Sequence, residues 1–176
     1  LTPGIRLGLK RIIEDVRWDD EAKVLVITGT GRGFCSGADM SGTGANPYAP
    51  TGRRTDLMEP RYKWAADFTS LDKPTIAAVN GVAAGGGLAV ALMCDMRIVA
   101  ESARFISVFV RRALIPDSGT TWLLPRIVGV PKALRMILTG EDVSAQEAYR
   151  IGLADEVVPD DQLMDKAMDL AQKIAS

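Results

Sequence analysis

The sequence predicts an α/β fold in which buried parallel strands alternate with helices. Two short apolar runs, Lys23–Thr28 and Thr75–Asn80, have the length and composition of strands buried on both faces, and each is followed by a glycine-bearing turn. Amphipathic helical patterns lie before, between and after them. With 176 residues, 47% of them hydrophobic and 24% charged, the chain can bury one sizeable core. Residues 1–176 are therefore predicted to form a single domain.

The first half of the chain opens on a helix. Thr2 followed by Pro3 is typical of an N-cap and a first helical residue, and the apolar residues that continue this helix are Ile5, Leu9, Ile12, Ile13 and Val16. Residues 41–56 are rich in Gly, Pro, Ser and Thr and predict a mobile surface segment. A helix is expected from about residue 57 to residue 71, before the strand that starts at Thr75.

The second half continues the alternation. The predicted elements are a short buried helix at Leu88–Met93, a strand at Met96–Ala100, a helix at Pro131–Leu138 stopped by Gly140, a helix opened by the capping box Ser144-Ala145-Gln146-Glu147 and stopped by Gly152, and a last helix with Leu163, Ala167, Leu170, Ala171 and Ile174 on one face.

The charge balance and the absence of histidine exclude several classes of function. The chain has 21 Lys plus Arg, 22 Asp plus Glu and no His. A net charge of −1 predicts no nucleic-acid partner and no electrostatic attachment to a membrane. Without imidazole, Ser-His-Asp and Cys-His catalysis and histidine zinc sites are excluded, so acid–base chemistry falls to carboxylates, Lys, Tyr or Cys.

The cysteines and the longest apolar stretch point to a reduced, non-membrane protein. Cys35 and Cys94 lie far apart and form no CxxC pair, so neither a metal site nor a disulfide framework is expected. Residues 75–93 contain Asn80 and four glycines, which favours two packed elements over a membrane span. A cytoplasmic location is the prediction.

Two glycine-bearing turns are the first candidate for chemistry. Residues 34–39 follow the first strand and residues 81–87 follow the second. Such turns can leave backbone N–H groups unpaired, and two of them aimed at one point form an oxyanion hole. The alternative is that the glycines only permit tight turns and close packing.

Five blocks of the sequence, in order, resemble the crotonase superfamily of enoyl-CoA hydratases and isomerases. The blocks are Phe34-Cys35-Ser36-Gly37-Ala38-Asp39-Met40, Asp72-Lys73-Pro74-Thr75-Ile76-Ala77-Ala78-Val79-Asn80-Gly81, Ala84-Gly85-Gly86-Gly87, Cys94-Asp95 and Leu138-Thr139-Gly140. The resemblance implies a spiral of ββα units, assembled as a homotrimer or a dimer of trimers. It also implies an acyl-CoA thioester as substrate, so coenzyme A enters with the substrate and no further cofactor or metal is expected. Strands before Leu1 and trimerisation helices after Ser176 are expected to be missing from the sequence.

The resemblance also assigns candidate catalytic groups. The backbone N–H groups of Ala38 and Gly86 would hold the thioester oxygen and stabilise an enolate. Hydratases of the family carry two Glu residues, but Ala89 and Phe109 occupy those positions here. The remaining candidate base is Asp117, whose neighbourhood resembles family members that isomerise enoyl-CoA double bonds. The alternative role for Asp117 is a helix N-cap.

Further residues are expected along the substrate or near it. The predicted substrate-binding residues are Ser36, Asp39, Met40, Gly85, Leu88, Phe109, Leu114 and Trp122. Arg111 and Arg112 have two interpretations, a solvated surface or recognition of a carboxylate on the acyl group. Tyr62, Trp64 and Phe68 are expected either in the core or around the acyl pocket.

The function predicted is enoyl-CoA double-bond isomerisation, or a related enolate step, with Asp117 as the single base. One alternative is a hydratase or acyl-CoA hydrolase of the same fold. The other is a catalytically silent acyl-CoA-binding or assembly subunit. Whether Asp117 faces a cavity or caps its helix distinguishes an enzyme from a silent subunit.

Overall fold

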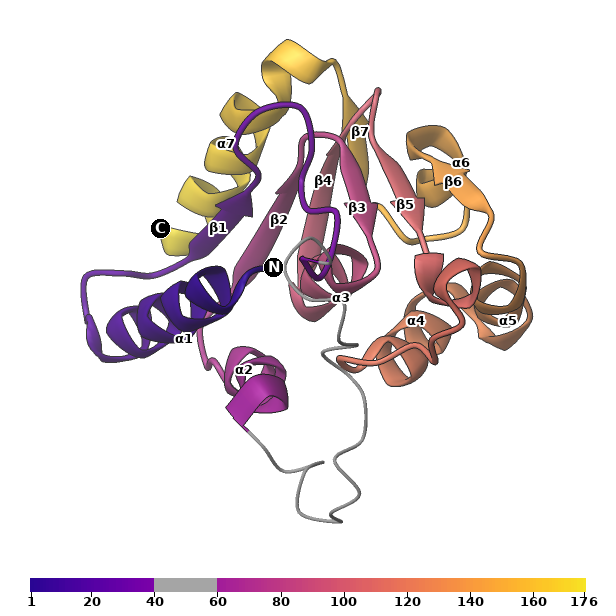
Figure 1. The fold of residues 1–176 in the computed structure, drawn as a ribbon. Helices are drawn as coiled ribbons and strands as arrows, with labels where there is room; N and C mark the ends of the chain where they lie inside the picture. Colours follow the sequence, from indigo (N-terminus) through magenta and orange to yellow (C-terminus); the bar gives the residue numbers. More distant parts are fainter. Residues whose placement is uncertain (40–59) are drawn as a thin grey trace.

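Two small β-sheets and their helices form the fold shown in Figure 1. The structure, a computed structural model, describes residues 1–39 and 60–176. One sheet has four parallel strands in the order β1 (Leu25–Thr28), β2 (Thr75–Val79), β4 (Met96–Ala100) and β7 (Glu156–Val158). The other has the order β3 (Val82–Ala84), β5 (Arg104–Ile106) and β6 (Asp142–Ser144).

Helices surround the two sheets. They are α1 (Pro3–Trp18), α2 (Pro60–Thr69), α3 (Gly86–Met93), the 3-10 helix η2 (Val108–Arg112), α4 (Thr120–Val128), α5 (Val130–Thr139), α6 (Ala145–Arg150), the 3-10 helix η3 (Asp160–Gln162) and α7 (Leu163–Ala175). In Figure 1, α7 runs along the four-stranded sheet, and it contacts β1, β2 and β4. Helix α3 follows β3 directly and packs against α2 and α4.

The strand predictions are confirmed in part. β2 is buried along its whole length and β4 along all but its first residue, because helices cover the sheet. β1 was predicted to be buried on both faces, and this is wrong. It lies at the edge of the four-stranded sheet and its residues are half-buried or exposed. The expectation of parallel pairing alone is also wrong, because β5 and β6 are antiparallel.

The predicted helix ends are found close to where the sequence placed them. The Thr2 side chain accepts a hydrogen bond from the Ile5 amide at 3.2 Å, and Ser144 accepts one from the Glu147 amide at 3.2 Å. Gly140 ends α5 in the left-handed conformation, with φ +65°. Of the predicted 41–56 segment, every residue lies outside the described part of the chain.

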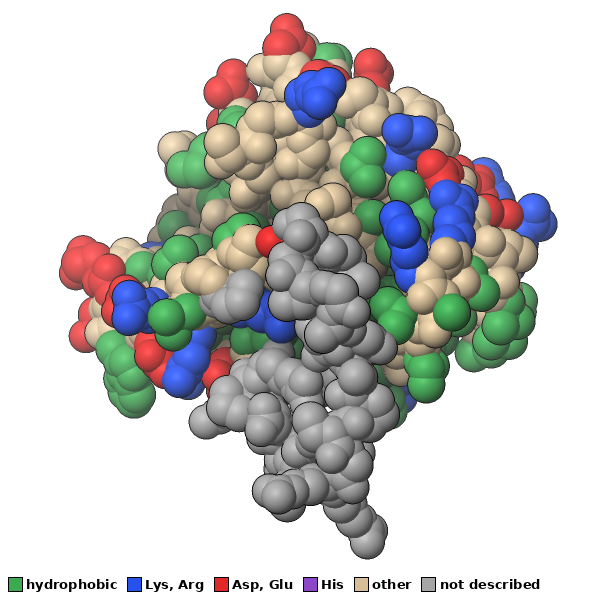
Figure 2. Space-filling view, viewed as in Figure 1, with side chains coloured by type: hydrophobic (Ala, Val, Ile, Leu, Met, Phe, Trp, Pro, Cys, Tyr) green, Lys and Arg blue, Asp and Glu red, His purple; other side chains and the backbone are tan. Residues whose placement is uncertain are grey.

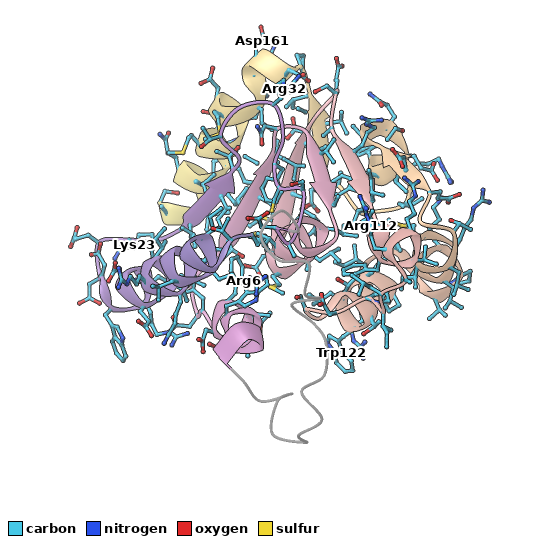
Figure 3. The ribbon with its side chains drawn as sticks, viewed as in Figure 1. Arg6, Lys23, Arg32, Arg112, Trp122 and Asp161 are labelled. Atoms are coloured by element: carbon cyan, nitrogen blue, oxygen red, sulfur yellow. The ribbon has the colours of Figure 1, made fainter. Side chains whose placement is uncertain are left out.

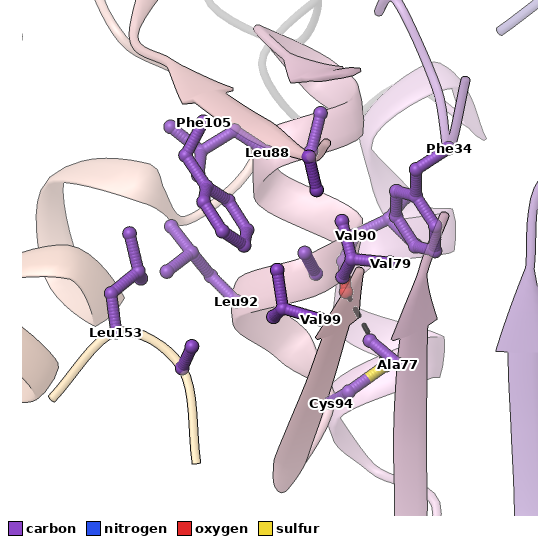
Figure 4. Packing of buried hydrophobic residues seen from close by; sticks show 14 of the residues in the cluster. Phe34, Ala77, Val79, Leu88, Val90, Leu92, Cys94, Val99, Phe105 and Leu153 are labelled. Atoms are coloured by element: carbon purple, nitrogen blue, oxygen red, sulfur yellow. Dashed lines mark hydrogen bonds between the residues drawn. The ribbon is translucent and has the colours of Figure 1, made fainter. Parts of the chain in front are cut away.

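The core gathers around α3. From Gly87 to Met93 this helix is entirely buried, and Figure 4 shows Leu88, Val90 and Leu92 among side chains from both sheets and the adjoining loops. Phe105 comes from β5, Val79 from β2 and Val99 from β4. Because its apolar residues leave no polar face, α3 has to lie inside the protein.

Asp95 and Arg97 hold the strands at the far end of α3. The Asp95 carboxylate accepts hydrogen bonds from the Thr75 amide at 2.8 Å and from the Thr75 hydroxyl at 2.7 Å. The buried Arg97 guanidinium donates to the carbonyls of Leu153 and Cys94, both at 2.7 Å. These charge-assisted bonds fix β2, β4 and the end of α3 relative to one another.

The surface mixes charged and apolar side chains, as Figure 2 shows for one face. Trp18, Ile115 and Leu138 are among the exposed large apolar residues. Among the described helices, none combines the length and the apolar composition needed to cross a bilayer.

A glycine at position 87 is required by packing, and this can be tested. A Cβ atom on Gly87 would lie 1.9 Å from the Cys35 carbonyl oxygen, whereas a Cβ on Gly8 in α1 meets nothing within 4 Å. We expect Gly87→Ala to lower the free energy of unfolding by about 2 kcal/mol or more, because the overlap is with backbone that cannot move aside. Gly8→Ala should raise it by about 0.5–1 kcal/mol. Urea denaturation followed by circular dichroism measures both, and equal effects of the two substitutions would contradict the packing argument.

Candidate active site

Backbone hydrogen bonds hold the two glycine-bearing turns side by side. The Cys35 amide donates to the Val82 carbonyl at 3.0 Å, and the Ala84 amide donates to the Cys35 carbonyl at 2.9 Å. These bonds make an isolated parallel bridge between Cys35 and Ala83. The loop after β1 thereby runs along β3, and its next residues reach the start of α3.

The side chain of Asn80 fixes the other end of the first loop. Its oxygen accepts a hydrogen bond from the Gly29 amide at 3.1 Å. Its amide group donates to the carbonyls of Gly29 at 3.1 Å and Gly31 at 2.9 Å. Asn80 directly follows β2, so its side chain ties the loop after β1 to the end of the neighbouring strand.

The amide nitrogens of Ala38 and Gly86 lie close together. A Cβ atom built on Gly37 would be 2.8 Å from the Ala84 carbonyl oxygen and 3.2 Å from the Gly86 nitrogen. A Cβ atom built on Gly86 would be 3.9 Å from the Ala38 nitrogen. Gly37 has φ +94° and Gly85 has φ +54°, and such positive values favour glycine. A side chain at Gly37 would prevent the two turns from lying this close together.

Neither of these two N–H groups has a partner within residues 1–39 and 60–176. Gly86 is the first residue of α3, so its amide is one of the donors that an α-helix leaves unpaired at its start. The dipole of the helix adds positive potential at the same point. Two adjacent unpaired donors can bind the oxygen of a polarised carbonyl group.

A cavity of about 300 Å³ lies against both turns. Residues 36–38 and 84–86, from the two turns, line it. Apolar side chains of Trp64, Val108, Phe109 and Leu114 form much of the rest. A cavity of this size with apolar walls and a few polar groups is typical of a small-molecule site.

Among the described residues that line this cavity, Asp117 is the acidic one. It lies in the loop between η2 and α4 and lines the cavity together with Ala38 and Gly86. Burial raises the pKa of the Asp117 carboxyl above the ordinary aspartate value, while the Ser118 hydroxyl and the Arg6 guanidinium oppose this effect. A raised pKa brings a carboxyl closer to the value suited to proton transfer at neutral pH.

The Asp117 side chain does not cap α4. The N-cap of α4 is Gly119, which has φ +81° and makes no side-chain capping bond. The main-chain carbonyl of Asp117 accepts a hydrogen bond from the Thr120 amide at 2.9 Å, but its carboxylate accepts one from the Ser118 hydroxyl at 3.1 Å. Ser118 itself has φ +51°, an uncommon conformation for a residue with a side chain.

The structure brings most of the sequence-predicted site residues to this cavity, and leaves others elsewhere. Ser36, Gly85, Phe109 and Leu114 line it beside the three candidate catalytic residues Asp117, Ala38 and Gly86. Met40 lies outside the described residues, and Asp39 is exposed and does not line the cavity.

Two predicted substrate-binding residues lie away from the cavity. Leu88 has no exposed surface and belongs to the core, as does the rest of α3 from Gly87 to Met93. Trp122 is 61% exposed, and the Arg126 guanidinium lies 3.0 Å from the centre of its ring. Trp122 therefore contributes a surface cation–π contact at α4.

Apart from Trp64 and Arg112, for which two interpretations were open, six cavity residues were not among the predicted site residues: Leu1, Arg6, Gly37, Ala84, Val108 and Ser118. The polar Arg6 next to the apolar Ile5 gave no signal that distinguished it from a solvated helix residue.

Trp64, which was expected either in the core or around the acyl pocket, is 5% exposed and lines the cavity. Arg111 and Arg112 have different environments. Arg111 forms an ion pair with Asp142 at 2.9 Å, whereas Arg112 lines the cavity.

Known proteins resemble this chain over its whole length. The family model described as enoyl-CoA hydratase/isomerase matches residues 1–176. The 1,2-epoxyphenylacetyl-CoA isomerase of Escherichia coli K12 is 40% identical over 169 residues, which cover 96% of this chain and 64% of that protein. The chain thus spans slightly less than two thirds of that relative.

Solved structures of similar proteins share the fold. A putative enoyl-CoA hydratase from Streptomyces coelicolor A3(2) superimposes with a TM-score of 0.89 at 36% identity, over 99% of this chain and 64% of that one. A monofunctional enoyl-CoA isomerase from M. smegmatis gives a TM-score of 0.79 at 37% identity, over 97% of this chain and 71% of that one. The predicted fold class is confirmed by these superpositions.

The pKa of Asp117 can be tested without any assay of activity. We expect ¹³C NMR of the labelled carboxyl to give a midpoint above that of an ordinary aspartate, because burial disfavours the charged form. Ser118→Ala should move the midpoint further up, since it removes a hydrogen bond that favours the carboxylate. An unchanged midpoint in Ser118→Ala would contradict the assigned contact.

Neutralising Asp117 should not weaken the fold. Folding raises the pKa of Asp117, so between the unfolded-state pKa and the higher folded-state pKa the native state binds more protons than the unfolded state. The free energy of unfolding therefore falls as pH rises through this range. Above the folded pKa the carboxylate therefore opposes folding. We expect Asp117→Asn to melt at the same temperature as wild type at neutral pH or at a higher one, as measured by calorimetry. A large fall in melting temperature would show that the carboxylate has a structural role instead.

Proposed function

The chain belongs to the enoyl-CoA hydratase/isomerase family, and we propose that its site moves the double bond of an enoyl-CoA thioester. The observation that carries this proposal is the position of one carboxylate, Asp117, in the same cavity as two unpaired backbone donors. A proton shift between two carbons needs one group that removes the proton and returns it. The substrate is a thioester, so coenzyme A enters as part of it and no separate cofactor takes part.

In the proposed reaction the thioester oxygen accepts hydrogen bonds from the amides of Ala38 and Gly86. The ionised carboxylate of Asp117 removes a proton from C2 of a 3-enoyl thioester. The electron pair of the broken C–H bond moves toward the carbonyl, and the negative charge of the dienolate collects on the oxygen held by the two amides. Asp117 then returns the proton to C4, so that the C3–C4 double bond becomes a C2–C3 double bond and the carboxylate is restored.

The residues around the cavity favour isomerisation over hydration. Adding water needs one group to activate the water and one to protonate carbon. The positions that hold Glu in hydratases are Ala89, which is buried, and Phe109, which lines the cavity as an apolar wall. Of the described residues that line the cavity, Asp117 alone is acidic.

Two alternatives are kept as outcomes of the test. A hydratase or acyl-CoA hydrolase would use Asp117 to activate water. A silent acyl-CoA-binding subunit would not need a carboxylate in the cavity, and the absence of a capping role for the Asp117 side chain argues against it. The single domain over residues 1–176, the homotrimer or dimer of trimers and the cytoplasmic location stay predictions.

The test follows isotope exchange by NMR and mass spectrometry. Purified protein is incubated in deuterated water with 3-enoyl-CoA and 2-enoyl-CoA thioesters of several chain lengths. We expect interconversion with deuterium at C2 and C4, and a loss of about 10²- to 10⁴-fold in rate for Asp117→Asn.

Asp165→Asn is the matched control, because Asp165 is exposed on α7, away from the cavity. It should react like wild type. Exchange that survives in Asp117→Asn would remove Asp117 from its assigned role. Formation of 3-hydroxyacyl-CoA or free coenzyme A as the main product would establish the hydratase or the hydrolase instead, and binding without turnover would establish the silent subunit.

A further inference from the structure

Arg6 brings a positive charge into the cavity that the proposed reaction does not use. It lies in the first turns of α1, and its side chain lines the cavity. Its Nη2 atom is 3.4 Å from the Leu1 carbonyl oxygen, a long hydrogen bond. Its Nε atom is buried and has no hydrogen-bond partner in the described structure. Because a guanidinium stays charged and a buried unpaired donor is unfavourable, this group is suited to an acceptor on a ligand.

Arg112 lines the same cavity from the other side. Arg112 is exposed at the end of η2, and its side chain forms no ion pair or hydrogen bond with any residue of the described ranges. Figure 3 shows Arg6 on the α1 side and Arg112 on the η2 side. In Figure 2 basic side chains accordingly face the viewer both beside α1 and over η2. The neighbouring Arg111 is neutralised by Asp142, so the two adjacent arginines have different environments.

The charged side chains of the cavity do not balance. Two arginines, Arg6 and Arg112, face one carboxylate, Asp117, among the described lining residues. Asp117 forms no ion pair with either of them. Even with Asp117 ionised, these side chains leave a net positive charge in a space with apolar walls. Such a cavity attracts an anionic group of the ligand.

The place of Arg6 in the cavity indicates which anionic group of the substrate it would bind. A thioester substrate offers phosphates on its nucleotide and, in some acyl groups, a carboxylate. Arg6 and Asp117 line the same cavity of about 300 Å³, and Asp117 would act on the acyl carbons. A group beside Asp117 therefore faces the acyl part of the substrate.

We infer that the cavity is built for an acyl group that carries a carboxylate of its own, bound by Arg6 with help from Arg112. The inference rests on the proposed binding of an acyl thioester and names the substrate class. The planar guanidinium of Arg6 would donate N–H groups to the oxygens of that carboxylate. Arg112, at the exposed end of η2, would add attraction for the anion at the cavity entrance.

Equilibrium binding tests this inference without any need for turnover. Calorimetry compares a saturated acyl-CoA that ends in a carboxylate with its amide-ended counterpart of equal length, and repeats both as pantetheine thioesters, which lack the nucleotide. Saturated chains cannot isomerise, so a failure of the proposed reaction leaves the comparison intact. We expect wild type to prefer the carboxylate by about 10- to 100-fold in both series.

Variants assign the preference to a residue. Arg6→Gln should remove most of the preference for the carboxylate. Arg6→Lys should retain part of it, because lysine keeps the positive charge but lacks the planar guanidinium. Arg112→Gln should reduce it severalfold and provides a second test if Arg6→Gln does not fold. Arg11→Gln is the matched control, since Arg11 is exposed on the same helix and does not line the cavity. It should bind like wild type.

Three results would overturn the inference. One is the absence of a preference for the carboxylate in wild type. Another is a preference that survives in both Arg6→Gln and Arg112→Gln. The third is a loss of affinity in Arg6→Gln that affects only the coenzyme A forms and is the same for both acyl ends, which would assign Arg6 to a nucleotide phosphate.

Discussion

The contact between the Cys35 carbonyl and Gly87 is the constraint on which the site depends. Any Cβ atom at position 87 would occupy the place of that carbonyl. Because the loop after β1 comes this close, both the amide and the carbonyl of Cys35 form hydrogen bonds with β3. These bonds place Ala38, three residues further on, next to the first turn of α3. The two candidate donors come from distant parts of the sequence, and this close approach places them next to each other.

Features that depend on neighbouring residues could be predicted from the sequence. The buried strands β2 and β4, the start of α1 at Thr2 and the end of α5 at Gly140 follow from local composition and capping. The candidate donors followed from glycine spacing together with the family resemblance. Asp117 followed because the usual Glu positions are apolar and no other acidic residue lies between Phe109 and Asp117.

Features that depend on how distant elements pack or on the order of strands could not be predicted from the sequence. Leu88 lies in the core because distant elements of the fold cover α3 from Gly87 to Met93, and the sequence of the helix does not specify those elements. Trp122 lies likewise between the buried Thr120 and Leu124, whose side of α4 faces the protein. The edge position of β1 and the antiparallel pairing of β6 depend on the order of strands, which composition does not encode.

The electrostatics of the cavity contain two opposing requirements. A carboxyl that removes a proton from carbon has to be ionised, yet the burial that excludes water from Asp117 favours its protonated form. The Ser118 hydroxyl and the Arg6 guanidinium both favour the carboxylate and so limit that effect. The same positive charge would also favour a dienolate, whose negative charge develops next to the Ala38 and Gly86 amides. Arg6 can thus serve the ionised base, the developing enolate and an anionic acyl group, because all three place negative charge in one small apolar space.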